Sequence, residues 1–385
     1  RINRKIGQVI SPDSHPAVMV KATSFYAGIF LRILLAAVRP DVASAFAAGG
    51  GFGKSTAPVA EHVPEASVSN LIDFLKAQGS KGIGSGVEVG RSIDSTIRGL
   101  YATKDFKKDQ ILCRIPSDCA LALSDPSEAG DGGSISAALG GLNFLKFYVK
   151  NPQAAMLWAP YLGSLPTQGS SDFDATPDFF SEEEVRELEF PRLINSVAGR
   201  LAEIRELAGE AQISVDDLHF AAWLVSSRSY RIAIDAGDDV DLDDGVRSTV
   251  SKPKRYLRVM LPFIDLANHS SDGANCEMHI VDPEKDDAWF TIRALRPIRA
   301  GKEIKLCYGT GVESSVELLA NYGFVQTDNK IDPLMLKKGG DDCITSIGGW
   351  KTTLEGDEAL LATGDLSDNM KKVLEFRCRL KRSYA

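Results

Sequence analysis

The sequence predicts an α+β protein in which segments with strand character flank a long helical block. Before the block, Ile111, Cys113 and Ile115 alternate with polar residues, as in a half-buried strand. After the block, Ile304 and Leu306 alternate in the same way. A helical pattern returns near the end of the chain. We therefore expect a discontinuous, β-rich domain that is split by a helical insertion and followed by a short helical C-terminal segment.

Start signals and apolar spacing identify the helices of the insertion. Ser181 with Glu184 has the spacing of a capping box, and Ser214 with Asp217 opens a further helix. The apolar positions between these two starts recur at helical spacing, namely Leu193, Val197, Leu201 and Ile204. The insertion therefore carries long helices with one apolar face.

Shorter signals predict the remaining elements. Residues 70–77 predict a short helix with one apolar face. Residues 125–140 are rich in Gly, Ser and Ala and predict a loop, with which the insertion begins. Phe290 and Ile292 alternate with polar residues, as in a strand. We place the insertion at about residues 125–230 of the chain.

Composition argues against several classes of protein. The chain has 385 residues, a net charge of −8 and a pI of about 5.3, which does not suit a general nucleic-acid-binding protein. The six cysteines are scattered without a CxxC or CxxH pair, so neither a zinc site nor a disulfide framework is indicated. They are Cys113, Cys119, Cys276, Cys307, Cys343 and Cys378. We expect no metal and no nucleic-acid partner.

Residues 1–60 differ from the rest of the chain and predict a targeting presequence. An apolar run from Phe25 to Val38 is broken only by Arg32 and is too short to span a bilayer comfortably. Small residues follow it, as at a processing site, so no stable membrane insertion is expected after processing. The string ASAFA at residues 43–47 resembles the junction in two-part presequences of algae with secondary plastids. This resemblance implies a plastid protein, with the cytoplasm as the alternative.

Two segments carry residue types that are suited to ligand binding and chemistry. Leu261–His269 is an apolar run that ends at Asn268 and His269, and residues 301–324 contain Tyr308 and a closing Tyr-Gly-Phe. An amide side chain can donate and accept, and an imidazole has two distinct nitrogens. Apolar runs that end in polar residues place these side chains where a ligand can reach them. Taken singly, His269 and Tyr308 are better explained by structural roles, as a histidine bonded to backbone and as a core tyrosine.

Together, the two segments resemble the SET-domain protein methyltransferases. The likeness is strongest to the plant Rubisco large-subunit methyltransferase-like group, in which a helical insertion splits the SET domain. The shared motifs, in chain order, are Pro262, Asp265 with Asn268-His269, Gly301 with Glu303, Tyr308-Gly309 and Tyr322-Gly323-Phe324. Residues 97–103 resemble the opening segment that cradles the cofactor, and residues 161–166 and 227–230 resemble markers of the insertion. The resemblance spans about residues 70–330.

The resemblance implies S-adenosylmethionine as the cofactor. The implied cofactor-binding residues are Thr96, Ile97, Arg98, Arg228, Asn268 and His269. Asn268 and His269 would hold the methionine part of the cofactor. Arg228 would contact the cofactor, and the opening segment from Thr96 to Arg98 would contribute backbone contacts.

The resemblance also implies a protein-lysine N-methyltransferase that acts on a non-histone protein, such as the Rubisco large subunit. Tyr308 would be the active-site tyrosine, Tyr322 would line the lysine channel, and Asp265 would lie near the target side chain. A lysine amine has an ordinary pKa of about 10.4 and must lose its proton before it attacks. A poorly solvated channel favours the neutral amine, and the Tyr308 hydroxyl can orient it toward the methyl group.

Two alternative functions stay open. Close relatives of this fold methylate a protein histidine, and Asp265 and the tyrosines suit either acceptor. The chain departs from the family at Ile97-Arg98, where small residues are usual. Residues 331–385 are shorter than the family's helical substrate-binding domain, and we expect them to be its start. Both departures would suit a non-catalytic SET-like module that binds protein.

Overall fold

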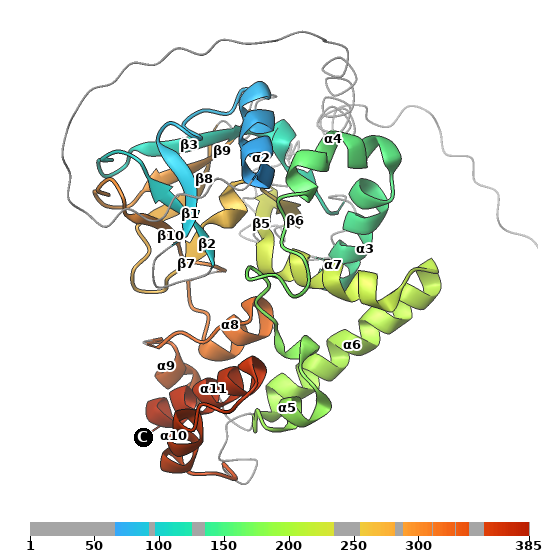
Figure 1. Cartoon of the computed structure of the whole chain (residues 1–385), viewed down its shortest axis with the longest axis vertical. Coiled ribbons are helices and arrows are strands. Elements are labelled where there is room, and N and C mark those ends of the chain that lie inside the picture. The colour runs from blue at the N-terminus through green and yellow to red at the C-terminus, as the bar shows by residue number, and fades with distance from the viewer. Residues whose placement is uncertain are drawn as a thin grey trace, which may run out of the picture.

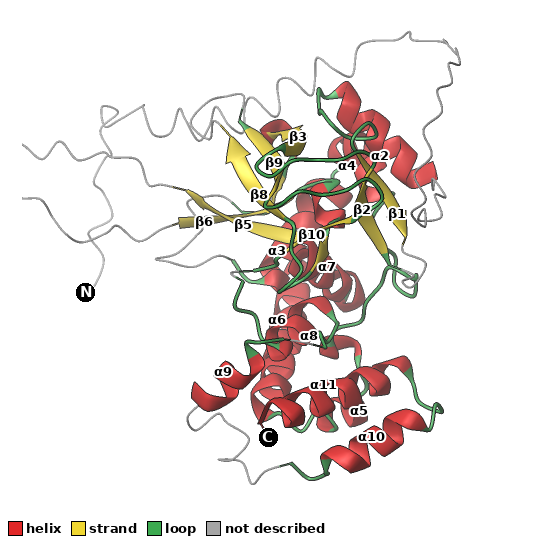
Figure 2. Cartoon of the chain, turned by 90° about the vertical axis from the view of Figure 1, so that its left-hand side faces the viewer, coloured by secondary structure: helices red, strands yellow, loops and turns green. Residues whose placement is uncertain are grey.

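The computed structural model contains a strand-rich part and a helical part (Figure 1). It describes residues 66–91, 97–124, 135–234, 255–281, 288–309, 311–327, 329–338 and 350–384. The strands lie together at one end of the molecule, the first helices of the insertion lie beside them, and the C-terminal helices lie at the opposite end (Figures 1 and 2). The predicted α+β class is confirmed.

The described strands form three small sheets. The first has the order β1 (Val87–Arg91), β2 (Arg98–Ala102), β10 (Glu303–Leu306) and β7 (Asn268–His269). The second has the order β3 (Ile111–Pro116), β9 (Trp289–Ala294) and β8 (Cys276–Val281). The third has the order β4 (Leu121–Ala122), β6 (Arg255–Met260) and β5 (Ser229–Ile234). Each sheet therefore joins strands from both sides of the insertion.

The first sheet brings the two predicted chemical segments together. β10 pairs with β7 in parallel, with Lys305 opposite Asn268 and Leu306 opposite His269. β10 also pairs with β2 in the antiparallel direction. Ile304 and Leu306 are buried, as their alternation predicts. The polar residues at the ends of β2, β7 and β10 consequently lie close together although they come from three distant parts of the chain.

The insertion connects β4 to β5 and is helical in its described part. Its helices are α3 (Ala137–Phe144), the π-helical turn η2 (Leu145–Val149), α4 (Pro152–Leu162), the short η3 (Pro177–Phe179), α5 (Glu182–Arg186), α6 (Pro191–Ala211) and α7 (Val215–Arg228). The other helices are α2 (Ala66–Ala77), η1 (Ser117–Cys119), η4 (Ile264–Leu266), α8 (Ser315–Tyr322), α9 (Asp332–Lys338), α10 (Leu354–Ala362) and α11 (Asp368–Tyr384). The capping box of Ser181 and Glu184 is confirmed at the start of α5.

The predicted loop over residues 125–140 is wrong at its end, because α3 begins at Ala137. Residues 125–134 lie outside the described residues. The glycines of α3 serve a close helix contact: a Cβ atom added to Gly141 would lie 2.6 Å from the backbone nitrogen of Ala222 in α7. Small residues here allow two helices to approach, and they do not break the helix.

The buried apolar residues form two clusters. The larger one joins the three sheets to α2, α3, α4 and α7. The smaller one joins α5 and the first half of α6 to α8, α9 and α11, through residues that include Phe190, Leu319 and Phe376. The C-terminal helices, drawn in red in Figure 1, thus pack against the lower end of the insertion and against the helix that carries Tyr322.

Some expectations fall on residues that the structure does not describe. The predicted presequence and Cys343 lie outside the described residues. The five described cysteines are free thiols, and the described residues contain no cluster of metal-ligating side chains. Within the same residues, none of the helices combines the length and the apolar character needed to cross a membrane.

Candidate active site

Asn268 lies in β7, at the edge of the first sheet, and two hydrogen bonds hold its side chain. Its side-chain amide donates to the carbonyl oxygen of Arg98 at 3.1 Å and to Oε1 of Glu303 at 2.8 Å. This contact requires glycine at position 99, because an added Cβ atom would lie 2.7 Å from Nδ2 of Asn268 and 2.8 Å from the Glu303 carboxylate. The amide therefore bridges β2, β7 and β10 in one fixed orientation.

His269 is hydrogen-bonded at both of its ring nitrogens, and Nδ1 links the two predicted segments. Its Nδ1 accepts a hydrogen bond from the backbone N–H of Tyr308 at 2.9 Å. The proton of the neutral ring is therefore on Nε2, which donates to the Ser271 hydroxyl at 2.8 Å, and that hydroxyl donates to Gln326 at 2.9 Å. Burial lowers the pKa of His269, which favours this neutral form. The ring positions the backbone of Tyr308.

Tyr308 lies in an aromatic cluster beneath this histidine. Its hydroxyl donates to the carbonyl oxygen of Ala267 at 2.7 Å. Its ring centre lies 4.7 Å from that of Tyr322 and 5.0 Å from that of His269. Burial raises the pKa of Tyr308 and raises that of Tyr322 to about 12. Both phenols are thus protonated at neutral pH and can act as hydrogen-bond donors and acceptors.

Asp265 is buried close to these tyrosines, with its side chain only 1% exposed. Its Oδ2 accepts a hydrogen bond from the Tyr161 hydroxyl at 2.7 Å and lies 3.9 Å from Nη1 of Arg228. Its Oδ1 has no hydrogen-bond partner among the described residues. Burial raises the pKa of Asp265, although Arg228 and the Tyr161 hydroxyl act in the opposite direction. One acceptor atom is therefore left for a ligand.

The chain is strained just before this carboxylate. Phe263 is fully buried and adopts φ of 74° and ψ of −46°, a combination that costs energy for a residue with a side chain. The backbone N–H of Asp265 then bonds to Leu261, which starts the single turn η4. This tight turn directs Asp265 inward and leads to Asn268 in β7, five residues after Phe263.

The opening segment contacts the site through its backbone. The carbonyl of Arg98 accepts the Asn268 amide, while its guanidinium turns away and binds Asp172 at 2.6 Å and the Ser164 carbonyl at 2.9 Å. Ile97 is 37% exposed at the start of β2. Thr96 lies outside the described residues. The backbone of Arg98 therefore orients Asn268, its side chain binds the insertion, and its predicted contact with the cofactor stays a prediction.

A sequence profile of the SET domain family matches residues 97–309, which is more than half of the chain. The chain belongs to the SET-domain family. This match begins at the opening segment and ends one residue beyond Tyr308. It therefore contains all of Leu261–His269 and the part of residues 301–324 that includes Tyr308.

Curated proteins are similar to this chain over part of their length. Actin-histidine N-methyltransferase of Canis lupus familiaris is 26% identical over 261 residues, which cover 63% of this chain and 40% of that protein. The enzyme of the same name from Homo sapiens is 24% identical over 269 residues, with the same coverage. The chain thus spans about 40% of the length of the curated relatives that it matches.

Solved structures share the fold of this SET domain. One is described as the SET domain of LSMT bound to lysine and AdoHcy, with a TM-score of 0.56, 16% identity, and coverage of 82% of this chain and 88% of that chain. Another is Rubisco LSMT bound to AdoMet, with a TM-score of 0.55, 16% identity, and coverage of 82% and 89%. At this identity the likeness concerns the fold.

Two tyrosines of the SET-domain site were not predicted to take part. Tyr161 of α4 donates to Asp265, and Tyr230 of β5 donates to the carbonyl of Ile264 at 3.2 Å. Burial, followed by the nearby Tyr308, raises the pKa of Tyr230 well above its ordinary value. Both tyrosines lie within the insertion markers at residues 161–166 and 227–230, but the resemblance assigned no role to either tyrosine. Their roles became clear only from the contacts in the structure.

The structure brings most predicted site residues of the SET domain together. Asn268, His269, Tyr308 and Tyr322 adjoin one another through β7, β10 and the aromatic cluster. Arg228 at the end of α7 donates to the backbone carbonyl of Asp265 at 3.2 Å. Hydrogen-bond donors and acceptors thus gather around a buried carboxyl. Such a site can orient a polar group and hold it away from water.

Proposed function

We propose that this SET-domain protein is an S-adenosylmethionine-dependent protein N-methyltransferase with a lysine side chain as the acceptor. The observation that carries the proposal is the convergence of the Asn268-His269 pair with Tyr308 and Asp265. These side chains come from two distant segments of the chain, which the parallel pairing of β7 with β10 and the hydrogen bonds of Asn268, His269 and Tyr308 bring together. The enzyme family supports the reaction class, and the site supports the assignment of roles.

The residues around Asn268 suit the proposed cofactor. Nε of Arg228 is buried and has no hydrogen-bond partner among the described residues, so it can donate to the carboxylate of the methionine part. The Asn268 amide is oriented by the Arg98 carbonyl and the Glu303 carboxylate. The cofactor would supply a methyl group that its sulfonium already activates. The protein's own part is then to align and desolvate the acceptor.

The cluster around Asp265 suits a lysine amine. Oδ1 of Asp265 can accept a hydrogen bond from the amine, and the Tyr308 oxygen can accept a second one while its hydroxyl still donates to Ala267. The raised pKa of Asp265 indicates a poorly solvated surrounding, which also favours the neutral form of an amine. A neutral lysine has two N–H groups, one for each acceptor, and one lone pair for the attack.

A second candidate is a protein histidine acceptor, which the names of the curated relatives favour. Those relatives are actin-histidine N-methyltransferases of 24–26% identity. An attacking imidazole offers a single N–H to the acceptors in this cluster. Asp265 alone could accept that N–H and orient the imidazole, and a histidine acceptor would not need the Tyr308 oxygen as a second hydrogen-bond acceptor.

We also propose a plastid location and a plastid protein, such as the Rubisco large subunit, as the substrate. This part of the proposal rests on the presequence-like string at residues 43–47 and on the resemblance of the motifs. A fusion of residues 1–60 to a fluorescent protein tests the location: we expect import into plastids, and diffuse fluorescence in the cytoplasm would contradict it.

The test of the proposed activity is a transfer assay with isotope-labelled S-adenosylmethionine. The purified chain is incubated separately with Rubisco and with actin, and mass spectrometry locates the modified residue. Methylated lysine supports the main proposal, and methylated histidine supports the second candidate. Binding of S-adenosylhomocysteine without transfer to either protein or to a plastid extract would favour a non-catalytic module.

Tyr308→Phe serves as the active-site variant in this assay. We expect transfer to fall by about 100-fold, because the phenol oxygen orients the acceptor. Tyr148→Phe is the matched control, because the Tyr148 hydroxyl donates to the backbone carbonyl of Ala122 at 2.9 Å, much as Tyr308 does to Ala267. Equal loss of transfer in both variants would contradict a catalytic role of Tyr308.

A further inference from the structure

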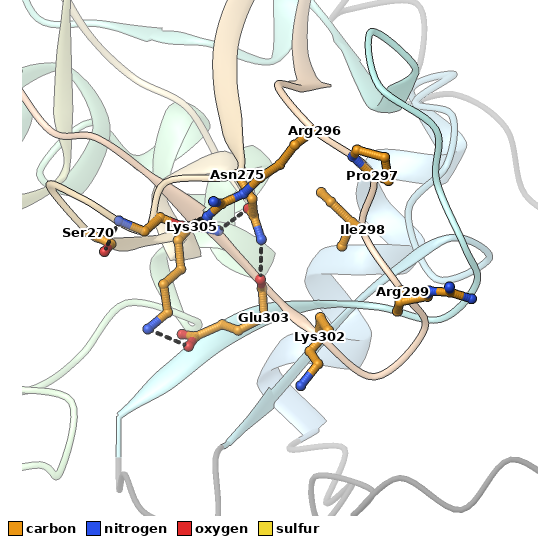
Figure 3. A pocket seen from close by; sticks show the side chains of 10 residues that line it. Ser270, Asn275, Arg296, Pro297, Ile298, Arg299, Lys302, Glu303 and Lys305 are labelled. Atoms are coloured by element: carbon orange, nitrogen blue, oxygen red, sulfur yellow. Dashed lines mark hydrogen bonds and ion pairs between the residues drawn. The ribbon is translucent and has the colours of Figure 1, made fainter.

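A pocket of about 550 Å³ opens beside β10, apart from the predicted catalytic cluster (Figure 3). Its walls come from the end of β7, the connection between β9 and β10, and β10 itself. No residue that was predicted for catalysis or for cofactor binding lines it. Glu303 is the shared boundary, because its Oε1 faces Asn268 while its Oε2 lies 3.1 Å from the Lys305 amine in the pocket.

The wall of this pocket is preformed by hydrogen bonds to β10. The Asn275 side chain donates to the carbonyl of Glu303 at 2.8 Å and accepts from the backbone N–H of Lys305 at 2.9 Å. The Arg296 guanidinium donates to the carbonyl of Gly273. The segment from 270 to 275 is thereby fixed as one wall, so a ligand would enter without first ordering it.

The charge of the lining is strongly positive in an otherwise acidic protein. Arg296, Arg299, Lys302 and Lys305 belong to the lining; in Figure 3 the Arg299 side chain extends away from the others, and Glu303 is joined to Lys305. Neither Arg296 nor Lys302 forms an ion pair with a carboxylate that the structure describes. Arg299 is paired with Asp105 at 3.5 Å, but both side chains are largely exposed, so this pair contributes little and can be exchanged.

We propose that this pocket is a second ligand site, which binds a phosphate-bearing small molecule. Arginine binds phosphate oxygens in pairs and lysine adds a point charge, so the lining suits an anion with several oxygens. The volume lies in the range of pockets for small molecules. The same charges would repel the sulfonium of S-adenosylmethionine, which distinguishes this pocket from a cofactor site. The proposal does not depend on the proposed methyl transfer.

Isothermal titration of the whole chain with inorganic pyrophosphate tests the site. We expect one bound pyrophosphate per chain and an affinity that weakens as salt is added, because the lining is partly exposed. Succinate, which lacks the phosphate geometry, is expected to bind at least about tenfold more weakly. Absence of pyrophosphate binding at low salt, or equal affinity for succinate, would overturn the proposal.

Charge-reversal variants locate the binding. The double variant Arg296→Glu/Lys302→Glu is expected to weaken pyrophosphate binding by at least about tenfold. Lys146→Glu/Lys150→Glu is the matched control, because it changes the net charge equally at two exposed lysines in and after η2, outside the pocket lining. Equal weakening by both variants would show a general charge effect and overturn the pocket as the site.

A competition measurement separates this site from the cofactor site. The affinity for S-adenosylhomocysteine is measured with and without saturating pyrophosphate. We expect both ligands to bind at once, because the two sites lie on opposite sides of Glu303. Mutual exclusion would overturn the proposal. If S-adenosylhomocysteine does not bind at all, the proposed function fails, whereas the pyrophosphate titration still decides the pocket.

Discussion

Two carboxylates close to the site, Asp172 and Asp265, have opposite surroundings. The Asp172 side chain is 8% exposed and receives the guanidinium of Arg91 at 2.8 and 3.0 Å, the backbone N–H of Arg98 at 3.1 Å and its Nε at 2.6 Å. Burial alone would raise the pKa of Asp172, but these arginines together lower it. Asp265 faces a more distant arginine and keeps a raised pKa.

This difference in surroundings indicates different roles: Asp172 stabilises the structure, and Asp265 is placed to bind a ligand. Asp172 belongs to the insertion, and it holds both stems of the segment between β1 and β2, at Arg91 and at Arg98. It thereby fixes the carbonyl that orients Asn268. Asp265 has an oxygen with no partner among the described residues, and its ionised form is disfavoured. Stability should therefore depend on Asp172, and transfer should depend on Asp265.

The largest expected effect is that of Asp172→Asn on folding. We expect the free energy of unfolding to fall by about 3 kcal/mol, because the buried Arg98 loses its carboxylate. Urea denaturation measures this change. We also expect weaker binding of S-adenosylhomocysteine by the folded protein, since Arg98 then holds Asn268 less well.

Asp178→Asn is the matched control for this variant. Asp178 also lies in the insertion and binds Arg200 Nε at 3.0 and 3.1 Å, but it has no contact with β1 or β2. We expect it to lower stability by about 1–2 kcal/mol and to leave the affinity for S-adenosylhomocysteine unchanged. If both variants lose affinity to the same degree, Asp172 has no specific role in positioning the cofactor segment.

The connection between the two regions passes through Gly99, and Gly99→Ala tests it. The added methyl group would overlap the Asn268 amide and the Glu303 carboxylate, so we expect a loss of about 1–3 kcal/mol in stability. The affinity for S-adenosylhomocysteine should fall with it. Gly209→Ala is a suitable control, because nothing lies within 4 Å of the added atom there. If Gly99→Ala binds S-adenosylhomocysteine as tightly as the wild type, the orientation of Asn268 does not contribute to cofactor binding.

For Asp265→Asn we expect the reverse of the Asp172 result. Stability at neutral pH should change by less than about 1 kcal/mol, because the substitution removes a charge whose burial is already unfavourable. Methyl transfer should fall by about 10- to 100-fold, since the acceptor loses an anionic partner. Parallel denaturation and transfer assays measure both quantities. A stability loss as large as that of Asp172→Asn would remove the distinction between the two carboxylates.

The smallest expected effects concern pH. The lowered pKa of Asp172 contributes stability above its unfolded pKa of about 3.9, and this stability is lost as the pH falls through the folded pKa. The raised pKa of Asp265 contributes stability below its unfolded value and loses it as the pH rises through the folded pKa. The stability of Asp172→Asn relative to the wild type should therefore be lower at neutral pH than in acid. The stability of Asp265→Asn relative to the wild type should be higher at neutral pH than in acid. Denaturation curves between pH 3 and 7 test these opposite signs.

The sequence by itself determined the class of fold, the succession of strands, helical block and further strands, and the family. Those features depend on local patterns: alternation places Ile304 and Leu306 inside, and a capping box starts α5. The motifs also singled out Asn268, His269 and Tyr308 as candidate site residues, because the resemblance depends on residue types in order. A local pattern misled at residues 137–140, where glycines serve helix contact and do not indicate a loop.

Only the tertiary structure decided which distant groups meet. Asp172 is 74 residues from Arg98, and Tyr161 is 104 residues from Asp265, so no periodicity relates them. β7 has only two residues and is defined by its pairing with β10. The pKa values of Asp172 and Asp265 diverge for the same reason, because burial and neighbouring charges arise when the chain folds. Local sequence specifies the elements, and long-range packing specifies the environment in which each carboxylate ionises.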